Sequence, residues 1–328
     1  MGRLEMKALS LKCVAIAAAL LGGAVTEAAA QGYPTKPVRM IVPFAPGGRV
    51  EAVARLIADA LSKDLGQPFL VESRPGAGGA TGADFVAKSQ PDGHVLLLCS
   101  AGVLSILPNV DKKLPYDPVK DFTPVARLIE GFTFIGAYPG LPAKSMAELV
   151  ALAKQKPNSI GYASSGVGTY SHLAGELVSI ASGAALKHVP YRGSGPALND
   201  IVAGHIPLMI GGELGELAKA GKIRILATTN EKRSPEFPDV PTMKESGFPQ
   251  FVAHSWVGLV GPANMPATVA DKLNVTLARV MADPATQEKL RGLGGEPAYQ
   301  PATDFGKTVA QDRDIYAEII AKAGLKFE

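Results

Sequence analysis

The sequence predicts an α/β protein with two units, each a mainly parallel sheet flanked by helices. Short apolar runs alternate with helical patterns along most of the chain. Glycine-rich loops follow the ends of several apolar runs, where the next helical pattern begins. The 328 residues are enough for two domains of ordinary size. Ligands of open α/β sheets lie outside the carboxyl ends of the strands. We therefore expect a cleft between two lobes, with glycine loops on both walls.

The first 30 residues have the pattern of a secretory signal peptide. Arg3, Lys7 and Lys12 form a basic start, an apolar stretch covers 13–25, and Ala28-Ala29-Ala30 offers a cleavage site. The apolar stretch is shorter than the roughly 20 residues that a membrane-spanning helix needs. We therefore expect residues 1–30 to be removed, and the mature protein to lie in the periplasm.

The first unit reads as strand, helix, strand, helix, strand. Strands are expected at 38–44, 69–71 and 94–99. A helical pattern begins near residue 50 and should end at Gly66, and a shorter helix is expected at 82–89. Such a βαβαβ unit is the start of a parallel sheet with helices on its faces.

The second unit repeats this alternation. Ser145 and Glu148 form a capping box that opens a helix ending near Lys156. A later helix should end at Gly183, and Pro196 suits the first position of the next one. Strands are expected at 160–163, 186–191, 206–210 and 223–228.

The last part of the chain should return to the first unit. A proline-rich segment at 234–249 reads as a surface connection, followed by a strand at 251–262. Helices at 267–281, 285–293 and 304–323 complete the chain. The predicted division is domain 1 at 31–131 plus 252–328, and domain 2 at 132–251, joined by a hinge.

Common cofactor and catalytic motifs are missing from the sequence. The Gly166-Val167-Gly168 run continues to Ser171 rather than to the third glycine of a dinucleotide fingerprint. No loop has the phosphate-loop G-K-[ST] pattern or the G-x-S-x-G nucleophile elbow. The five histidines lack metal-ligand spacing. We therefore expect a binding protein without cofactor or metal, and not an enzyme.

The net charge and the cysteine content also limit what the protein can do. A net charge of +3 gives no field suited to nucleic acid. Cys99 is the single cysteine after the leader and lies in an apolar run. We interpret Cys99 as a buried small hydrophobic residue.

Taken together, a series of short motifs resembles one known family. It is similar to the substrate-binding proteins of tripartite tricarboxylate transporters, often called Bug-type receptors, from Tyr33 to the C-terminus. The motifs that carry the resemblance are, in order, Tyr33-Pro34-x-Lys36-Pro37, Val42-Pro43-Phe44-Ala45-Pro46-Gly47-Gly48, Glu72-Ser73-Arg74-Pro75-Gly76-Ala77-Gly78-Gly79, Pro91-Asp92-Gly93, Leu114-Pro115-Tyr116-Asp117-Pro118, Pro142-Ala143-Lys144-Ser145, Tyr162-Ala163-Ser164, His188-Val189-Pro190-Tyr191-Arg192-Gly193 and Pro238-Asp239-Val240-Pro241-Thr242.

The resemblance implies a hinged, Venus-flytrap receptor that is monomeric and binds a small organic acid, most often a di- or tricarboxylate. The acid would be delivered to the membrane permease subunits of a tripartite transporter. Family members pinch one carboxylate between a loop of each domain, and backbone N–H groups with hydroxyl donors suit that task. Carried over to this sequence, the expected ligand-binding residues are Phe44, Pro46, Gly47, Gly48, Arg49, Ser164, Ser165, Gly166, Gly168, Thr169, Tyr191 and Arg192.

Departures from the family pattern centre on Arg49. The family usually has small hydroxyl residues and an aspartate where this chain has Arg49-Val50-Glu51, and an acidic residue where it has Gly211-Gly212. A guanidinium at the first loop could grip a second carboxylate of the ligand. Trp256, the single tryptophan, matches a family position and is expected to pack in the core or hinge.

The sequence leaves two other functions open. The same cleft could serve a receptor that reports to a signalling kinase. An exported hydrolase would need a nucleophile with a base, for which Ser100 or Ser164 with His172 are the candidates.

Overall fold

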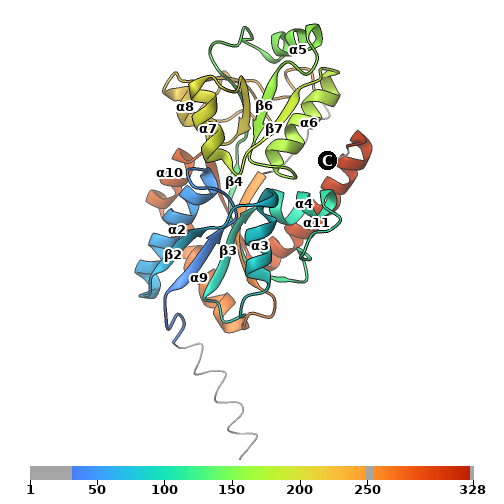
Figure 1. Ribbon diagram of the computed structural model, residues 1–328. Coiled ribbons are helices and arrows are strands. Elements are labelled where there is room, and N and C mark those ends of the chain that lie inside the picture. The colour runs from blue at the N-terminus through green and yellow to red at the C-terminus, as the bar shows by residue number, and fades with distance from the viewer. Residues whose placement is uncertain (1–31, 249–254, 326–328) are drawn as a thin grey trace, which may run out of the picture.

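The computed structural model describes residues 32–248 and 255–325. Two lobes, each built on one sheet, lie one above the other (Figure 1). The first sheet has six strands in the order β11-β4-β10-β3-β1-β2. The second has five strands in the order β7-β6-β8-β5-β9. The predicted α/β architecture with helices around two sheets is confirmed.

The first lobe begins with the predicted βαβαβ unit. Its elements are β1 (Val38–Val42), α2 (Arg49–Leu65), β2 (Phe69–Ser73), α3 (Ala80–Ala87) and β3 (Val95–Ser100). Strand β1 pairs in parallel with both β2 and β3. Helix α2 ends at Gly66 as predicted, because that residue takes the left-handed conformation that stops a helix (φ 73°).

Three antiparallel strands complete the first sheet. They are β4 (Phe122–Gly131), β10 (Ser255–Pro262) and β11 (Gly295–Pro301). Strand β10 runs antiparallel to β3 and β4, and β11 antiparallel to β4. The sheet is therefore mixed rather than mainly parallel. The reason is that the chain enters β4 on its way to the second lobe and comes back along β10 in the opposite direction.

The second sheet is mixed for a similar reason. Its strands are β5 (Phe134–Ala137), β6 (Gly161–Ser164), β7 (Lys187–Pro190), β8 (Leu208–Gly211) and β9 (Arg224–Thr228). Strand β6 is parallel to β7 and β8. Strand β5 enters from the first lobe and is antiparallel to β8 and β9, so the prediction of a mainly parallel sheet is corrected here as well.

The helices of the second lobe are α5 (Met146–Gln155), α6 (Tyr170–Ser182), α7 (Ser194–Ala203) and α8 (Leu214–Lys219). The capping box is present, because the side chain of the residue before α5 accepts a hydrogen bond from the backbone N–H of Glu148. Helix α6 ends at a left-handed glycine, as predicted.

One helix start differs from the prediction. Helix α7 begins at Ser194, after the N-cap Gly193, so Pro196 is its third residue rather than its first. Proline is tolerated there because the N–H groups of a first helical turn have no partner within the helix.

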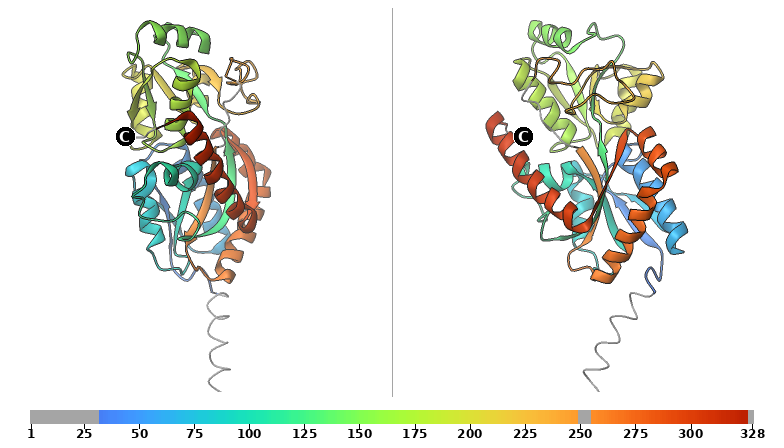
Figure 2. Two further views of the ribbon diagram at one scale, coloured as in Figure 1. Left: turned by 90° about the vertical axis from the view of Figure 1, so that its right-hand side faces the viewer. Right: turned by 180° about the vertical axis from the view of Figure 1, so that it is seen from behind.

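The remaining helices enclose the first sheet (Figures 1 and 2). Helix α9 (Ala267–Ala282) contacts α2 and α10 (Pro284–Gly292). The long α11 (Ala302–Ala323) packs against β4 and the turn after β3, and its last turns reach the level of the second lobe (Figure 2). Across the described ranges 32–248 and 255–325, no helix has the length and apolarity required to span a membrane.

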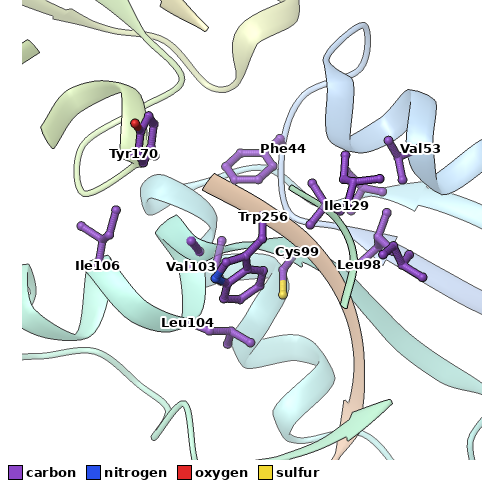
Figure 3. Close-up of a cluster of buried hydrophobic side chains, with 14 of the residues drawn as sticks. Phe44, Val53, Leu98, Cys99, Val103, Leu104, Ile106, Ile129, Tyr170 and Trp256 are labelled. Carbon is purple, nitrogen blue, oxygen red and sulfur yellow. The ribbon is translucent and has the colours of Figure 1, made fainter. Parts of the chain in front are cut away.

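The core of the first lobe contains Trp256 and Cys99, both among the buried side chains of Figure 3. The Trp256 indole donates to Asp312 on α11 (2.6 Å) and meets the ring of Phe305 edge to face. The expected packing role of Trp256 is confirmed. Cys99 is fully buried, as predicted, and burial raises the pKa of its thiol.

The chain leaves the first sheet at Gly131 and joins the second at Phe134. The predicted boundary between residues 131 and 132 lies at this passage, while the boundary at 251 and 252 lies outside the described residues. The proposed signal peptide at 1–30 also lies outside them. The division into two domains with a hinge therefore stays a prediction.

Candidate functional site

A cavity of about 60 Å³, here called the interlobe cavity, lies between the two lobes. The first lobe contributes the loop after β1, the start of α2, the end of β3 and the start of β10, while the second contributes the N-termini of α6 and α7 and the end of β8. The lining residues are Phe44, Ala45, Gly48, Arg49, Val50, Glu51, Ser100, Thr133, Ser165, Thr169, Tyr170, Ser171, Ser194, Ile210, Gly211, Gly212, Glu213 and Ser255.

The lobes touch at the rim of this cavity. The backbone N–H of Ala45 donates to the carbonyl of Arg192 across the gap (2.8 Å). Near this bond, Gly195 lies so close to Pro46 that an added Cβ would overlap the Pro46 carbonyl oxygen. The structure therefore has the two lobes in a closed arrangement.

The first glycine loop, residues 43–48, is stabilised by a glutamate of its own helix. Gly47 has a φ of 92°, and its backbone N–H donates to Glu51 Oε2 (2.6 Å). The other oxygen of Glu51 accepts from the guanidinium of Arg55. Burial alone would raise the pKa of Glu51, but the Gly47 N–H and Arg55 hold it below its usual value. The negative charge of Glu51 is therefore balanced by Arg55 within helix α2.

The Arg49 side chain turns inward from the loop and is only 8% exposed. Its Nη1 donates to the carbonyls of Phe132 (2.8 Å) and Gly294 (3.2 Å), and its Nη2 donates to the Ser255 hydroxyl (3.2 Å). The guanidinium occupies the space that a side chain at Gly212 would need. The glycine at position 212 is therefore what allows Arg49 to lie here.

Two polar groups in the cavity wall have no partner. The Arg49 Nε–H and the Thr133 hydroxyl are buried without a hydrogen bond to any residue in the described part of the chain. Burial lowers the pKa of Arg49, and the negative charge of Glu213 acts in the opposite direction. A buried donor that lacks an acceptor costs free energy, so a polar ligand or water at this wall would stabilise it.

Glu213 brings a carboxylate from the second lobe to the start of α2. Its Oε1 accepts from the backbone N–H of Arg49 (2.9 Å) and from the Ser194 hydroxyl (2.5 Å). Burial alone would raise the pKa of Glu213, but the Arg49 charge, these two donors and the backbone N–H of Glu213 itself hold it below its usual value. The carboxylate is therefore ionised at neutral pH, next to the positive end of α2.

The second glycine loop, residues 164–169, is held by hydroxyl groups instead. The Ser164 hydroxyl accepts from the N–H of Gly166 (3.1 Å), and the Ser171 hydroxyl accepts from the N–H of Ser165 (3.0 Å). Thr169 donates to the carbonyl of Gly166 (2.6 Å). The first turn of α6 has no acidic residue. Its positive end therefore faces the cavity, and the turn itself adds no carboxylate there.

Two stacked imidazoles support this loop from behind. The rings of His172 and His188 lie 3.8 Å apart, and Gly168 donates its N–H to His172 Nδ1 (3.2 Å). Burial lowers the pKa of His172 to about 3, with the neighbouring His188 adding to the shift, and lowers that of His188 to about 4. Both rings are therefore neutral at physiological pH.

One of the two serines that a hydrolase could use, Ser164, is part of this support. Ser164 Oγ lies 2.6 Å from Nε2 of His188, rather than pairing with His172. Ser164 is fully buried, so its hydroxyl faces the loop and not the cavity. The geometry therefore does not favour Ser164 with His172 as a catalytic pair, whereas Ser100, the other candidate, lines the interlobe cavity.

The predicted ligand residues fall into three sets, of which the first two overlap. Phe44, Gly48, Arg49, Ser165 and Thr169 line the interlobe cavity. A second cavity of about 200 Å³ lies nearby, and the predicted residues that line it are Phe44, Ser165, Gly166, Tyr191 and Arg192. Pro46, Gly47, Ser164 and Gly168 shape the loops without lining either cavity. Ligand contact by these twelve residues stays a prediction.

Sequence reasoning missed Glu213, Thr133, Ser171 and Ser194. Glu213 follows the end of strand β8, so the rule that ligands lie beyond strand ends could have found it. Thr133 follows β4, a strand that the sequence did not predict. Within the described residues, no group of three or more His, Cys, Asp or Glu side chains could hold a metal ion.

The chain matches known proteins over most of its length. Residues 53–325 match the model of the tripartite tricarboxylate transporter family receptor. Protein BugT of Bordetella pertussis is 33% identical over 313 residues, which is 93% of this chain and 95% of that protein. The periplasmic binding protein BugD has a similar structure, with a TM-score of 0.86 and 36% identity over 90% of this chain and 99% of that one.

A second similar structure contains an acid. It is an R. palustris protein with adipate, with a TM-score of 0.87 and 33% identity over 90% of this chain and 99% of that one. The lobes, the glycine loops and these matches agree: the chain belongs to the tripartite tricarboxylate transporter receptor family and is a periplasmic solute-binding receptor of the Bug type.

Proposed function

We propose that this receptor captures a small organic acid in the interlobe cavity and delivers it to the membrane subunits of a tripartite tricarboxylate-type transporter. In this proposal the carboxylate lies at the N-terminus of α6, the hydroxyls of Ser165, Thr169 and Ser171 surround it, and Arg49 supplies the positive charge of the opposite wall. An N-terminal signal peptide ending near residue 30 would direct the protein to the periplasm.

The observation that carries the proposal is the pairing of two positive features across one cavity. Helix α6 presents its N-terminus with no acidic residue in its first turn, and the buried Arg49 cation lies in the other wall. The Arg49 guanidinium donates to two carbonyls and one hydroxyl rather than to a carboxylate. An anionic ligand would therefore supply the negative charge that the N-terminus of α6 lacks. The adipate in the R. palustris relative supports an acid as ligand.

Substitution of Arg49 tests this role. A thermal-shift screen of mono-, di- and tricarboxylates, aromatic acids and amino acids first identifies the best acid. A ligand at 100 times its Kd should raise the stability by about 2.7 kcal/mol. Hydrogen bonds to charged groups contribute roughly 1.5 to 3 kcal/mol, so Arg49→Ala should weaken the best acid about ten- to a hundredfold. Arg49→Lys should recover only part, because lysine lacks the planar fork.

Calorimetry on the three proteins gives the answer, with circular dichroism to confirm that each variant is folded. Equal affinities for all three, or a neutral compound as the best ligand, would contradict the proposal.

Delivery to a transporter is tested in cells. Deleting the gene for this receptor, or those for the membrane subunits, should abolish uptake of the radiolabelled acid that the screen identifies. Uptake that persists in both deletions, together with an acid-dependent change in gene expression that needs the receptor, would favour the sensor alternative.

A further inference from the structure

We propose that Glu213 is a latch between the lobes: it caps helix α2 of the first lobe from the second lobe and holds the receptor closed. The latch consists of protein groups alone, so it favours the closed form whichever ligand the cavity accepts. The inference therefore goes beyond the proposed function, and the two can fail separately.

The first residue of α2 obtains its hydrogen-bond acceptor from the other lobe. The N-cap residue of α2 is Gly48, which has no side chain to accept from the first N–H groups of the helix. By contrast, the side chains of Ser145 and Asp283 cap α5 and α10, the helices that directly follow them. The N–H of Arg49 instead donates to Glu213 Oε1 (2.9 Å), 164 positions away. Helix α2 is thus capped from the second lobe.

The second lobe holds the Glu213 carboxylate in place for this bond. Glu213 lies between β8 and α8, and its Oε1 also accepts from the hydroxyl of Ser194 at the start of α7 (2.5 Å). Ser194 lies so near α2 that a Cβ added at Gly48 would come within 2.5 Å of its hydroxyl oxygen. The cap therefore exists only while the lobes touch, and separating them leaves the Arg49 N–H and the carboxylate to water.

The charge of Glu213 strengthens this contact. A carboxylate is stabilised at a helix N-terminus, and hydrogen bonds with an ionised partner are stronger than neutral ones. The Arg49 guanidinium of the first lobe also attracts the carboxylate and lowers its pKa. The bond from the N–H of Ala45 to the carbonyl of Arg192 also joins the lobes, but between two neutral groups. We therefore expect Glu213 to contribute more to closure than that bond.

Single-molecule FRET on the dialysed receptor, with no ligand added, measures the ratio of open to closed molecules. Dyes are attached through Lys112→Cys in the first lobe and Ile180→Cys in the second, both at exposed positions, while Cys99 is buried. The wild-type protein should be mainly closed. Glu213→Ala should raise the ratio about tenfold or more, as expected when a charged hydrogen bond is lost. Glu213→Gln should raise it less, because the amide oxygen still accepts but has no charge.

Glu216→Ala is the matched control. It removes a carboxylate from α8 at an exposed position, where the ion pair with Lys219 (2.9 Å) lies within the second lobe. This variant should keep the wild-type ratio of open to closed molecules. Circular dichroism and the unfolding temperature show whether each variant is folded.

A second pair of variants removes the donor of the bond instead of the acceptor. Arg49→Pro and Arg49→Ala both lack the guanidinium, but only the proline variant also lacks the N–H that donates to Glu213. Proline suits the first position of a helix, so α2 should form in both variants. Arg49→Pro should have a ratio of open to closed molecules several times that of Arg49→Ala. This comparison still tests the latch if Glu213→Ala does not fold.

Three results would overturn the latch. They are a wild-type protein that is mainly open without ligand, a ratio that rises equally or not at all in Glu213→Ala and Glu216→Ala, and equal ratios in Arg49→Pro and Arg49→Ala. None of these measurements needs a bound acid. A receptor that binds no acid in the thermal-shift screen would contradict the proposed function, and the latch would still be judged by the ratios.

Discussion

The two glycine loops have the same place in their lobes but opposite chemistry. Each follows a parallel strand and leads into a helix that begins at the interlobe cavity, α2 in the first lobe and α6 in the second. The N–H groups at the start of α2 donate to carboxylates, with Gly47 bonded to Glu51 and Arg49 to Glu213. The loop before α6 is held by serine and threonine hydroxyls and by a neutral histidine.

This difference shows how the same loop-and-helix arrangement can give the two walls of the interlobe cavity different charges. Carboxylates at α2 compensate the positive end of that helix, so the first wall gains fixed charges of both signs. Hydroxyls and a neutral imidazole satisfy the loop before α6 without adding charge. The end of α6 is then left for an anion from solution, which is where we place the ligand carboxylate.

The largest loss of ligand affinity is expected from a substitution where the two lobes touch beside the cavity. In the closed arrangement Gly195 approaches the Pro46 carbonyl so closely that a methyl group would overlap it. Gly195 has an ordinary helical φ as the second residue of α7, so Gly195→Ala adds no backbone strain. With the lobes held apart, the ligand should lose the charged hydrogen bonds of one wall, which contribute roughly 1.5 to 3 kcal/mol. Affinity for the best acid should fall about ten- to a hundredfold by calorimetry.

A matched control is Gly292→Ala at the end of α10, where an added Cβ meets no atom within 4 Å. It should keep wild-type affinity. Unchanged affinity in Gly195→Ala would show that the ligand does not need both walls, and the comparison of the two walls would then lose its functional meaning.

A smaller effect should appear in the pH dependence of stability. His172 and His188 have pKa values of about 3 and 4 in the folded protein, below the usual 6.5 of the unfolded chain. The unfolded state therefore binds more protons between pH 6.5 and 4, and the stability is complete above pH 6.5 and falls as the pH decreases through this range. At pH 5.5 each histidine should reduce the free energy of unfolding by about 1.4 kcal/mol.

His188→Gln should halve the contribution of this pair, because glutamine can still bond to the Ser164 hydroxyl but does not titrate. Urea unfolding at pH 7.5 and 5.5 gives the loss of stability for each protein. His205→Gln, at an exposed histidine, is the control. If His188→Gln and wild type lose the same stability between these pH values, the second loop does not depend on neutral imidazoles, and the contrast with the first loop weakens.

Prediction from the sequence succeeded where a feature depends on neighbouring residues. The start of α5 at its capping box and the ends of α2 and α6 at glycine are local effects of backbone geometry and hydrogen bonding. Strand β4 was missed because Pro124 argues against a central strand. The structure places Pro124 next to an irregularity in the pairing of β4 with β10, and such a shift of register can accommodate a residue that has no N–H.

The sequence alone determined the family, the strands that precede the glycine loops, and the presence of an unusual arginine at position 49. Only the tertiary structure decided what Arg49 and Glu213 do. The partners of Arg49 are Phe132, Ser255 and Gly294, which are 83, 206 and 245 positions away, and Glu213 is 164 positions from the N–H it accepts. Helix caps and turns act within a few residues, whereas a buried charge is stabilised by whichever distant groups the fold brings to it.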